Sequence, residues 1–471
     1  MPRQRTTTAT TTGSATRGAR TPGLFARTAL ASLLTAGIAL AMTSPLAAAG
    51  VQREQIERRA AQADSQVIAW RRDFHQHPEL SNREFRTARV VAEALEALGL
   101  EVQRQIAHTG VTAVLRGARP GPVVALRADM DGLPVTEQVD LPFASKQRTE
   151  YQGAEVGVMH ACGHDAHTAI LLGAAQVLSG MREQLRGTVL FVFQPAEEGA
   201  PSGEQGGAKL MLAEGALDDP RPDAIFGLHV VPQHEAGTLA YRSGGAMASS
   251  DRLRIVVRGR QSHAAYPWLG VDPIAVASRI VLALQSLPAR QLDARIPSIV
   301  SFGVIRGGVR GNIIPDEVEL LGTLRALDPA LRERLHERVR STAEKLAESF
   351  DASAEVEIEL GNPITYNDPA LTARMLPTLR RVAGDEQLIE ALPRTGSEDF
   401  SLYAQQIPGL YFWLGIRPKG TAPAEAASNH SPHFFVDESA LGLGVRAMSN
   451  LAVDFLENDT SSGTIQQKRT D

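Results

Sequence analysis

A change in sequence pattern near Gly245 constrains the fold more than any other feature of this chain. The segment that follows alternates strand-like and helix-like apolar periods in the order β-α-β-β-α-β, the pattern of a small ferredoxin-like α+β domain. It covers roughly a hundred residues, a natural size for a domain. The expected elements are strand 253–257, helix 273–287, strands 299–305 and 317–324, helix 329–350 and strand 354–360.

The flanking segments have a different character. Short apolar runs alternate with helical patterns before residue 245, and long helices with a strand at 410–416 return after Pro363. At 471 residues the chain is too long for one ordinary core. We therefore expect an α/β layered domain, with its site at strand ends, interrupted by an inserted domain. The expected parts are a leader 1–49, a layered domain 50–245 and 362–458, an insertion 246–361, and a polar tail 459–471.

The N-terminal leader has the features of a secretory signal peptide. Five arginines and no acidic residue lie between Met1 and Arg27, followed by an apolar run at 29–42 and an alanine-rich segment that ends at Ala49. This pattern predicts export, to a periplasm or the outside medium, with cleavage near Ala49. An organellar transit peptide is the weaker alternative. The apolar run is too short to span a bilayer comfortably, so we expect no stable membrane anchor.

Charge and aromatic content argue against a nucleic-acid partner. Lys and Arg total 48 against 53 Asp and Glu, a formal net charge of −5. The chain therefore lacks the basic footprint that nucleic-acid binding requires. With 14 Phe, 6 Tyr and 3 Trp, a platform for stacking bases is also not expected.

The densest cluster of chemically active side chains lies at 160–167. It holds three His, one Asp and Cys162, the only cysteine of the chain. Cys162 and His164 can reach one metal ion if the backbone turns, and Gly163 between them permits that turn. A thiolate beside divalent cations is stabilised as the anion. The cluster predicts a metal site.

Other candidates follow predicted strands. Glu197 and Glu198 come directly after the apolar run that ends at Phe193, and neighbouring side chains on a turning backbone point in different directions. One carboxylate could bind metal while the other acts as a general base toward a metal-bound water. His229 and His430 also lie near strand ends, where a lone His is more often a satisfied core residue than a ligand.

Taken together, these segments resemble the M20 metallopeptidases, and within them the N-acyl-amino-acid amidohydrolases, which include hippurate hydrolases and auxin-conjugate hydrolases. The resemblance extends from about Ile56 to Leu456. It rests on the runs 127–134, 159–167, 194–199, 262–265, 395–400 and 430–432, together with His229.

The resemblance implies a role for each matching residue. The expected ligands of two divalent cations per subunit are Cys162, His164, Glu198, His229 and His430. Glu197 would be the general base, His263 would reach into the partner subunit's site to stabilise the tetrahedral intermediate, and Asp129 would support the metal site. Asn312 and Arg325 would bind the substrate carboxylate. His433 leaves the last ligand open, because it lies three residues beyond His430.

The resemblance also implies the activity. We expect a secreted amidohydrolase that uses a metal-activated water to cleave small N-acyl amino acids, dimerising through the inserted (lid) domain. Mn²⁺ or Zn²⁺ is the expected metal, and Co²⁺ or Ni²⁺ is compatible with mixed N, O and S ligands. The alternatives are an M20-type dipeptidase or aminopeptidase acting on free peptides, and a binding protein that has lost the chemistry.

Overall fold

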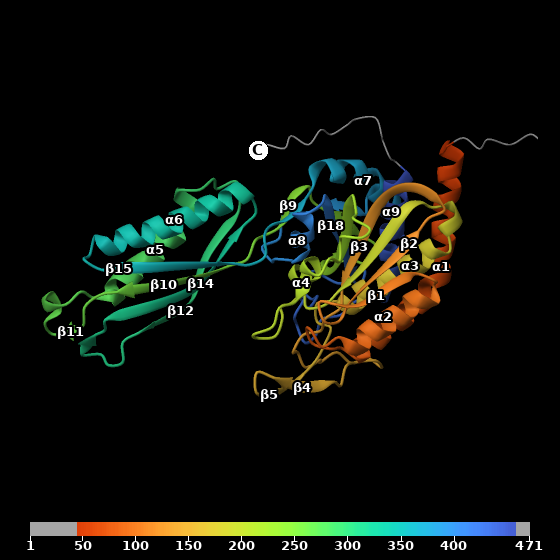
Figure 1. Ribbon diagram of the computed structural model, residues 1–471. Helices are drawn as coiled ribbons and strands as arrows, with labels where there is room; N and C mark the ends of the chain where they lie inside the picture. The colour runs from red at the N-terminus through yellow and green to blue at the C-terminus, as the bar shows by residue number, and fades with distance from the viewer. Residues whose placement is uncertain (1–44, 458–471) are drawn as a thin grey trace, which may run out of the picture. The chain divides into compact units, whose positions relative to one another are not determined.

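The computed structural model describes residues 45–457, and its main sheet has eight strands (Figure 1). The central strands β6, β3, β7 and β18 run parallel, whereas β2 and β8 join them antiparallel. In spatial order the strands are β1 (Glu101–Ile106), β2 (Gly110–Arg116), β6 (Arg186–Gln194), β3 (Arg119–Asp129), β7 (Ala224–Glu235), β18 (Gly409–Arg417), β8 (Leu239–Tyr241) and β17 (Leu388–Glu390).

Strand β6 shows that this sheet is covered on both faces. Phe191 and Phe193 belong to one hydrophobic cluster, while Leu190 and Val192 belong to another. Because successive side chains of a strand point to opposite faces, an unbroken apolar run requires helices on both sides. The first cluster contains residues of α1 (Pro45–Gln76), α2 (Phe85–Ala97), α3 (His164–Ser179), α7 (Pro369–Ala383) and α9 (Leu441–Glu457), and the second contains residues of α4 (Gly207–Ala213) and α8 (Phe400–Ala404).

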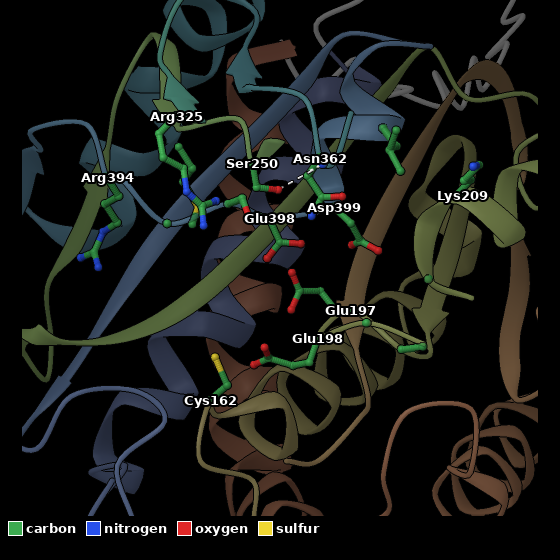
Figure 2. A pocket seen from close by; sticks show the side chains of 18 of the residues that line it. Cys162, Glu197, Glu198, Lys209, Ser250, Arg325, Asn362, Arg394, Glu398 and Asp399 are labelled. Carbon is green, nitrogen blue, oxygen red and sulfur yellow. Dashed lines mark hydrogen bonds between the residues drawn. The ribbon is translucent and has the colours of Figure 1, made fainter. Parts of the chain in front are cut away.

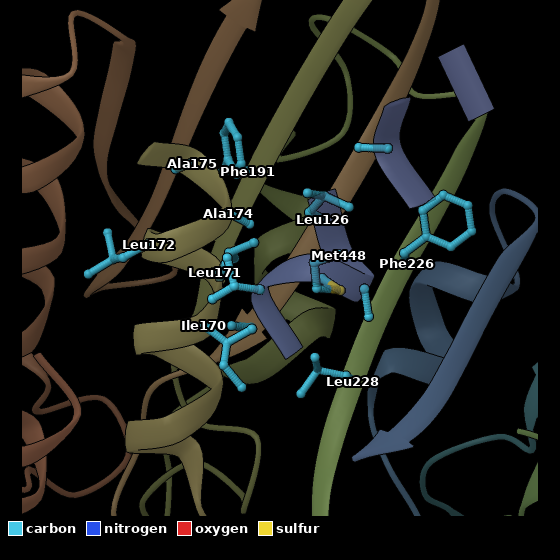
Figure 3. Close-up of a cluster of buried hydrophobic side chains, with 14 of the residues drawn as sticks. Leu126, Ile170, Leu171, Leu172, Ala174, Ala175, Phe191, Phe226, Leu228 and Met448 are labelled. Atoms are coloured by element: carbon cyan, nitrogen blue, oxygen red, sulfur yellow. The ribbon is translucent and has the colours of Figure 1, made fainter. Parts of the chain in front are cut away.

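Helix α3 is buried along almost its whole length and fixes the floor of the site. Ile170 and Leu171 of α3 gather with Met448 of α9 against Leu126 and Leu228 of the sheet (Figure 3). These side chains are at most 3% exposed. Dense packing of this kind gives the N-terminus of α3 a fixed position.

The inserted domain has the predicted β-α-β-β-α-β order. Helices α5 (Pro273–Arg290) and α6 (Pro329–Glu348) begin at Asp272 and Asp328, whose side chains accept hydrogen bonds from backbone N–H groups of the first turn. Apolar residues of β10 such as Ile255 pack with the helices, while the other face carries cross-strand Arg–Glu pairs such as Arg254–Glu319. The antiparallel sheet has the order β12 (Ser298–Gly307), β14 (Glu317–Ala326), β10 (Asp251–Arg258), β15 (Ser353–Leu360).

The two chain segments that enter and leave the insertion are hydrogen-bonded to each other. Ser250 N donates to the carbonyl oxygen of Asn362 at 2.9 Å, and Asn362 N donates to Ser250 Oγ at 3.2 Å. A Cβ on Gly361 would lie 1.9 Å from Ser250 O, so only glycine allows this approach. The expected domain limits stay predictions.

Short elements complete the described chain. The predicted leader lies outside the described residues up to position 44, and the predicted tail lies outside them from position 459. Among the described helices, none is both long and apolar enough for a membrane span. The remaining elements are β4 (Arg148–Tyr151), β5 (Ala154–Gly157), β9 (Gly244–Met247), β11 (Ser262–His263), β13 (Ile313–Ile314), β16 (Thr365–Asn367) and the 3₁₀ turns Arg182–Gln184, Pro267–Leu269 and Glu438–Ala440.

Candidate metal centre

The carboxyl ends of the parallel strands meet at a pocket of about 990 Å³ (Figure 2). Strand β3 ends at Asp129, β6 ends three residues before Glu197, and β7 carries His229. In open α/β sheets this edge is where ligands bind, since the loops that leave parallel strands converge there. The pocket is lined by five of the site residues predicted in the layered domain: Cys162, Glu197, Glu198, His229 and His430.

Cys162, His164 and His229 place one donor atom each within 4.8 Å of one another. Cys162 Sγ lies 3.3 Å from His229 Nε2. The Nδ1 of His229 lies 2.7 Å from the carbonyl oxygen of Val230, so Nδ1 carries the proton and the Nε2 lone pair faces the thiol. His164 directs Nδ1 at Asp131 Oδ1 (3.1 Å), and its buried Nε2 has no hydrogen-bond partner among residues 45–457.

A second group joins Cys162 to Glu198 and His430. Glu198 Oε1 lies 2.9 Å from His430 Nε2, and this contact raises the pKa of His430 above its usual value. His433 is exposed and belongs to none of the candidate metal-binding groups among the described residues. The geometry therefore favours His430 over His433.

The donor set fits divalent cations. Burial and the carboxylates of Glu198 and Glu197 raise the pKa of the Cys162 thiol well above its usual range, so the thiolate needs positive charge beside it. Burial opposes a charge on His164, but Asp129 and Asp131 outweigh it and raise its pKa to about 10. Sulfur, imidazole and carboxylate donors around an unpartnered imidazole nitrogen are the ligands that Zn²⁺ and similar metals take.

Glu197 lies beside these groups in a strongly negative environment. Its Oε2 is 4.0 Å from His164 Nε2, and Figure 2 shows Glu398 and Asp399 facing it across the pocket. Burial, then Glu398 and Glu198, raise the pKa of Glu197 well above its usual range. A carboxyl group in such surroundings can hold a proton at neutral pH.

A buried ion network supports the site from below. Arg127 donates to Asp129 Oδ2 at 2.7 Å and to Asp399 Oδ1 at 2.9 Å, and it lies 3.0 Å from Glu398 Oε1. Asp129 Oδ1 lies 2.6 Å from Nδ1 of His167, whose Nε2 accepts from the backbone N of Val230. Both ring nitrogens of His167 are thus engaged within the protein.

The model of the peptidase family M20/M25/M40 matches residues 125–454. The chain belongs to this family. It is therefore an M20-type hydrolase.

Named relatives agree with the M20 assignment. Thermostable carboxypeptidase 1 of Saccharolobus solfataricus is 39% identical over 85% of this chain and 98% of the relative. N-acetylcysteine deacetylase of Bacillus subtilis is 38% identical over 83% of this chain and 97% of the relative. The solved YXEP protein of Bacillus subtilis, described as a dinuclear metal binding peptidase from the M20 family, has a TM-score of 0.71 and 36% identity over 84% of this chain and 99% of its own.

Three site residues were predicted in the inserted domain, and only one of them lines the pocket. Arg325 lines the pocket and donates to the carbonyl oxygen of Ser249 at 3.5 Å. His263 and Asn312 are exposed, and neither is among the pocket-lining residues. They lie close together on the β11–β13 ribbon, where Ala264 N donates to Asn312 O at 3.1 Å. Within one chain the structure does not bring them to the metal centre.

Several residues of this M20 site have no role among those predicted from the sequence. Asp131 contacts His164 Nδ1 and accepts from Glu198 N at 3.1 Å, so it orients two candidate ligands. Arg127, Glu398 and Asp399 form the network described above. All four lie inside the runs that carry the family resemblance, and this was the signal available for them.

Proposed function

We propose that this M20 protein is an exported, metal-dependent amidohydrolase that converts N-acyl amino acids to a carboxylic acid and a free amino acid. The observation that carries the proposal is the group formed by Cys162, His164 and His229 beside Glu197 and Glu198, in one pocket. The name of the N-acetylcysteine deacetylase relative supports an acylated substrate.

The proposed metal ligands are Cys162, His164, Glu198, His229 and His430, with Mn²⁺ or Zn²⁺ as the favoured metal. Two divalent cations, when bound, would polarise the scissile carbonyl and make a water acidic enough to lose its proton near neutral pH. The similarity to the YXEP protein, a dinuclear metal binding peptidase, supports the number of ions.

Glu197 takes the proton of the attacking water and delivers it to the leaving nitrogen, so that a neutral amine departs. Burial and the carboxylates of Glu398, Glu198 and Asp399 raise the pKa of Glu197 and favour its protonated form, which stabilises the intermediate stage of that transfer. Arg325 binds the free carboxylate of the amino acid, a task that suits a planar guanidinium. Asp129 supports the site through Arg127 and His167.

We further propose a homodimer through the inserted domain, in which the partner copy supplies His263 and Asn312. Strand β12 is an edge of its sheet, and its Ile305 is 61% exposed. Exposed edge strands pair readily with another chain. Mixing Glu197→Gln and His263→Ala subunits should restore up to about a quarter of wild-type activity, since half of the hybrids' sites would be complete. No recovery in a verified mixed dimer contradicts supply from the partner.

Export is proposed from the residues 1–49 alone. Fusing that segment to a reporter enzyme that is active only outside the cytoplasm tests it, with the mature N-terminus determined by sequencing. A reporter that stays inactive, or an N-terminus at Met1, overturns the proposal.

The activity itself is tested with protein stripped of metal and reloaded with Mn²⁺ or Zn²⁺. Amine release is followed from N-acetyl, N-benzoyl and indoleacetyl amino acids, with free dipeptides alongside. Metal-dependent cleavage of the acylated set alone supports the amidohydrolase. Cleavage of peptides instead would favour the peptidase alternative, which the name of the carboxypeptidase relative supports. Cleavage of neither set would favour a binding protein.

A further inference from the structure

Arg394 brings a positive charge to the wall of the metal-site pocket without a carboxylate partner. The side chain is half-buried, and its guanidinium carbon lies 5.1 Å from the ring centroid of Trp413. Its Nη1 donates to the neutral amide oxygen of Gln233 at 3.2 Å. Across residues 45–457 no carboxylate approaches Arg394 within ion-pair distance, and burial lowers its pKa. A guanidinium nonetheless stays charged at neutral pH.

Two other arginines at this pocket provide a comparison with Arg394. Arg252 is exposed and pairs with Glu359 at 3.5 Å. Arg325 resembles Arg394, because it is half-buried and donates to a backbone carbonyl oxygen. Figure 2 shows Arg325 and Arg394 on the same wall of the pocket. A partly buried guanidinium without an ion-pair partner favours an anion beside it. Of the two, Arg325 has the carboxylate of Asp251 near enough to raise its pKa against the effect of burial.

Backbone pairing fixes Arg394 near the metal centre. Trp413 on β18 is paired with His229 on β7, and paired residues of adjacent strands have their side chains on the same face. The ring beneath Arg394 therefore neighbours a proposed metal ligand. Arg394 N donates to Ala246 O at 2.9 Å and its carbonyl accepts from Ala248 N at 3.0 Å, so the residue is held at both sides.

We propose that Arg394 binds a second carboxylate of the substrate, in addition to the α-carboxylate assigned to Arg325. The proposal rests on the proposed function and narrows its substrate class to N-acyl amino acids with two carboxylates. A guanidinium matches a carboxylate with two parallel hydrogen bonds. The second carboxylate belongs either to an acidic amino-acid side chain or to a dicarboxylic acyl group, and both present the same chemistry to Arg394.

Matched substrate pairs test this in the metal-loaded, full-length protein. N-acetylglutamate is compared with N-acetylglutamine, and N-succinylalanine with N-butanoylalanine. We expect kcat/KM to favour the acidic member of at least one pair by about tenfold or more, as expected for a hydrogen bond between charged groups. Which pair shows the preference identifies the source of the carboxylate.

Variants connect the preference to the residue. Arg394→Met keeps an unbranched chain over Trp413 and should bring the acidic-to-neutral ratio close to one, while Arg394→Lys should keep part of it. Arg252→Met, at the same pocket, should leave the ratio as in the wild type. A wild-type ratio near one in both pairs, or an Arg394→Met protein with the wild-type ratio, overturns the proposal.

A binding measurement separates this proposal from the proposed function. Calorimetric titration of metal-loaded Glu197→Gln protein, with and without Arg394→Met, compares the affinities for the two members of each pair. Tighter binding of the acidic member that depends on Arg394, without hydrolysis by the wild type, would refute the amidohydrolase and retain the anion site. If the wild type hydrolyses the substrates but the two members of each pair bind with equal affinity, the amidohydrolase is retained and the anion site at Arg394 is refuted.

Discussion

Glu198 Oε1 and His430 Nε2 lie 2.9 Å apart, although the two residues are more than two hundred positions apart in the chain. His430 has φ = 68°, in the left-handed region, and its N–H donates to the carbonyl oxygen of Ala161 at 2.8 Å. The side chain of Asn429 donates to the carbonyl oxygen of Cys162 at 3.1 Å. The loop that carries His430 is therefore fastened directly to the segment that carries the thiol.

His430→Ala should lose bound metal, whereas His433→Ala should retain it. Removing His430 deletes one nitrogen donor next to Glu198, while the exposed His433 contacts none of the donor atoms. Metal content after dialysis against a weak chelator, measured by mass spectrometry, checks this. Equal retention by both variants would exclude His430 as a ligand.

Glu197→Gln should retain metal and lose turnover by about 10²–10⁴-fold, the usual contribution of a general base. The amide has nearly the same shape but accepts no proton. Glu198→Gln is the matched control, because it should weaken metal binding as well. A Glu197→Gln protein with near-normal kcat would rule out its role as the base.

Gly163→Ala should destabilise the folded protein and weaken metal binding. Gly163 has φ = +96°, and a Cβ there would lie 2.2 Å from Val230 Cγ2. Gly153→Ala is the control for conformational strain alone, since Gly153 has φ = +80° and open space around it. We expect about 1–2 kcal/mol for Gly153→Ala and clearly more for Gly163→Ala in urea unfolding. Equal losses of unfolding free energy in the two variants would show that the contact between the new Cβ and Val230 is relieved at little cost.

Arg127→Met should cost about 3–5 kcal/mol of unfolding free energy, because it leaves buried carboxylates without their counter-charge. The exposed Arg258, which pairs with Glu355 at 3.1 Å, provides the control Arg258→Met. That change should cost less than about 1 kcal/mol. Similar unfolding midpoints for the two variants would contradict a central role for the network.

Acid should destabilise the junction of the inserted domain through Asp251. Burial alone would raise its pKa, but hydrogen bonds from His336 and Arg332 outweigh burial and lower the pKa from 3.8 to about 2. The stabilisation is therefore complete above pH 3.8 and disappears as the pH falls through 2, a loss of about 2 kcal/mol.

The measurement for Asp251 is the unfolding free energy between pH 5 and pH 2. Asp251→Asn should lower stability at pH 5 and flatten the acid dependence. Asp293→Asn removes an exposed carboxylate whose pKa is also lowered to about 2 by the hydrogen bond from Arg295. Because solvent screens this exposed pair, the change should alter the curve little. An unchanged slope in Asp251→Asn would place the acid sensitivity elsewhere.

Much of the fold could be predicted because its periods are local. The apolar run that ends at Phe193 predicts a strand, and β6 extends from Arg186 to Gln194. The predicted strand–helix order of the insertion was confirmed. Helix α3 begins at His164, although the apolar helical pattern begins only at Ala166. The polar residues there obscure the apolar period, and Gly163 at φ = +96° marks the true start.

The site could be predicted only in part. Cys162 and His164 are two positions apart, so their spacing was informative. Arg127 and Asp399 are 272 positions apart, and no local pattern shows that they meet. The role of Asp131 is also hard to predict from the sequence, because its contacts with Ser81 and His164 span 50 and 33 positions. Such partnerships depend on strand order, which only the folded sheet reveals.

The insertion leaves the layered domain at Ser250 and returns to it at Asn362, and these two residues are hydrogen-bonded neighbours in space. The insertion is therefore joined to the rest of the chain at one place. The distance that any replacement must bridge is short and does not depend on the replacement's length, and closure entropy grows only slowly with loop length. We therefore expect that recombination can exchange the inserted domain among relatives while the eight-stranded sheet keeps its fold and its metal ligands. Variation in the substrate contacts that the insertion supplies, such as Arg325, would then be separate from variation in the eight-stranded sheet and in Arg394.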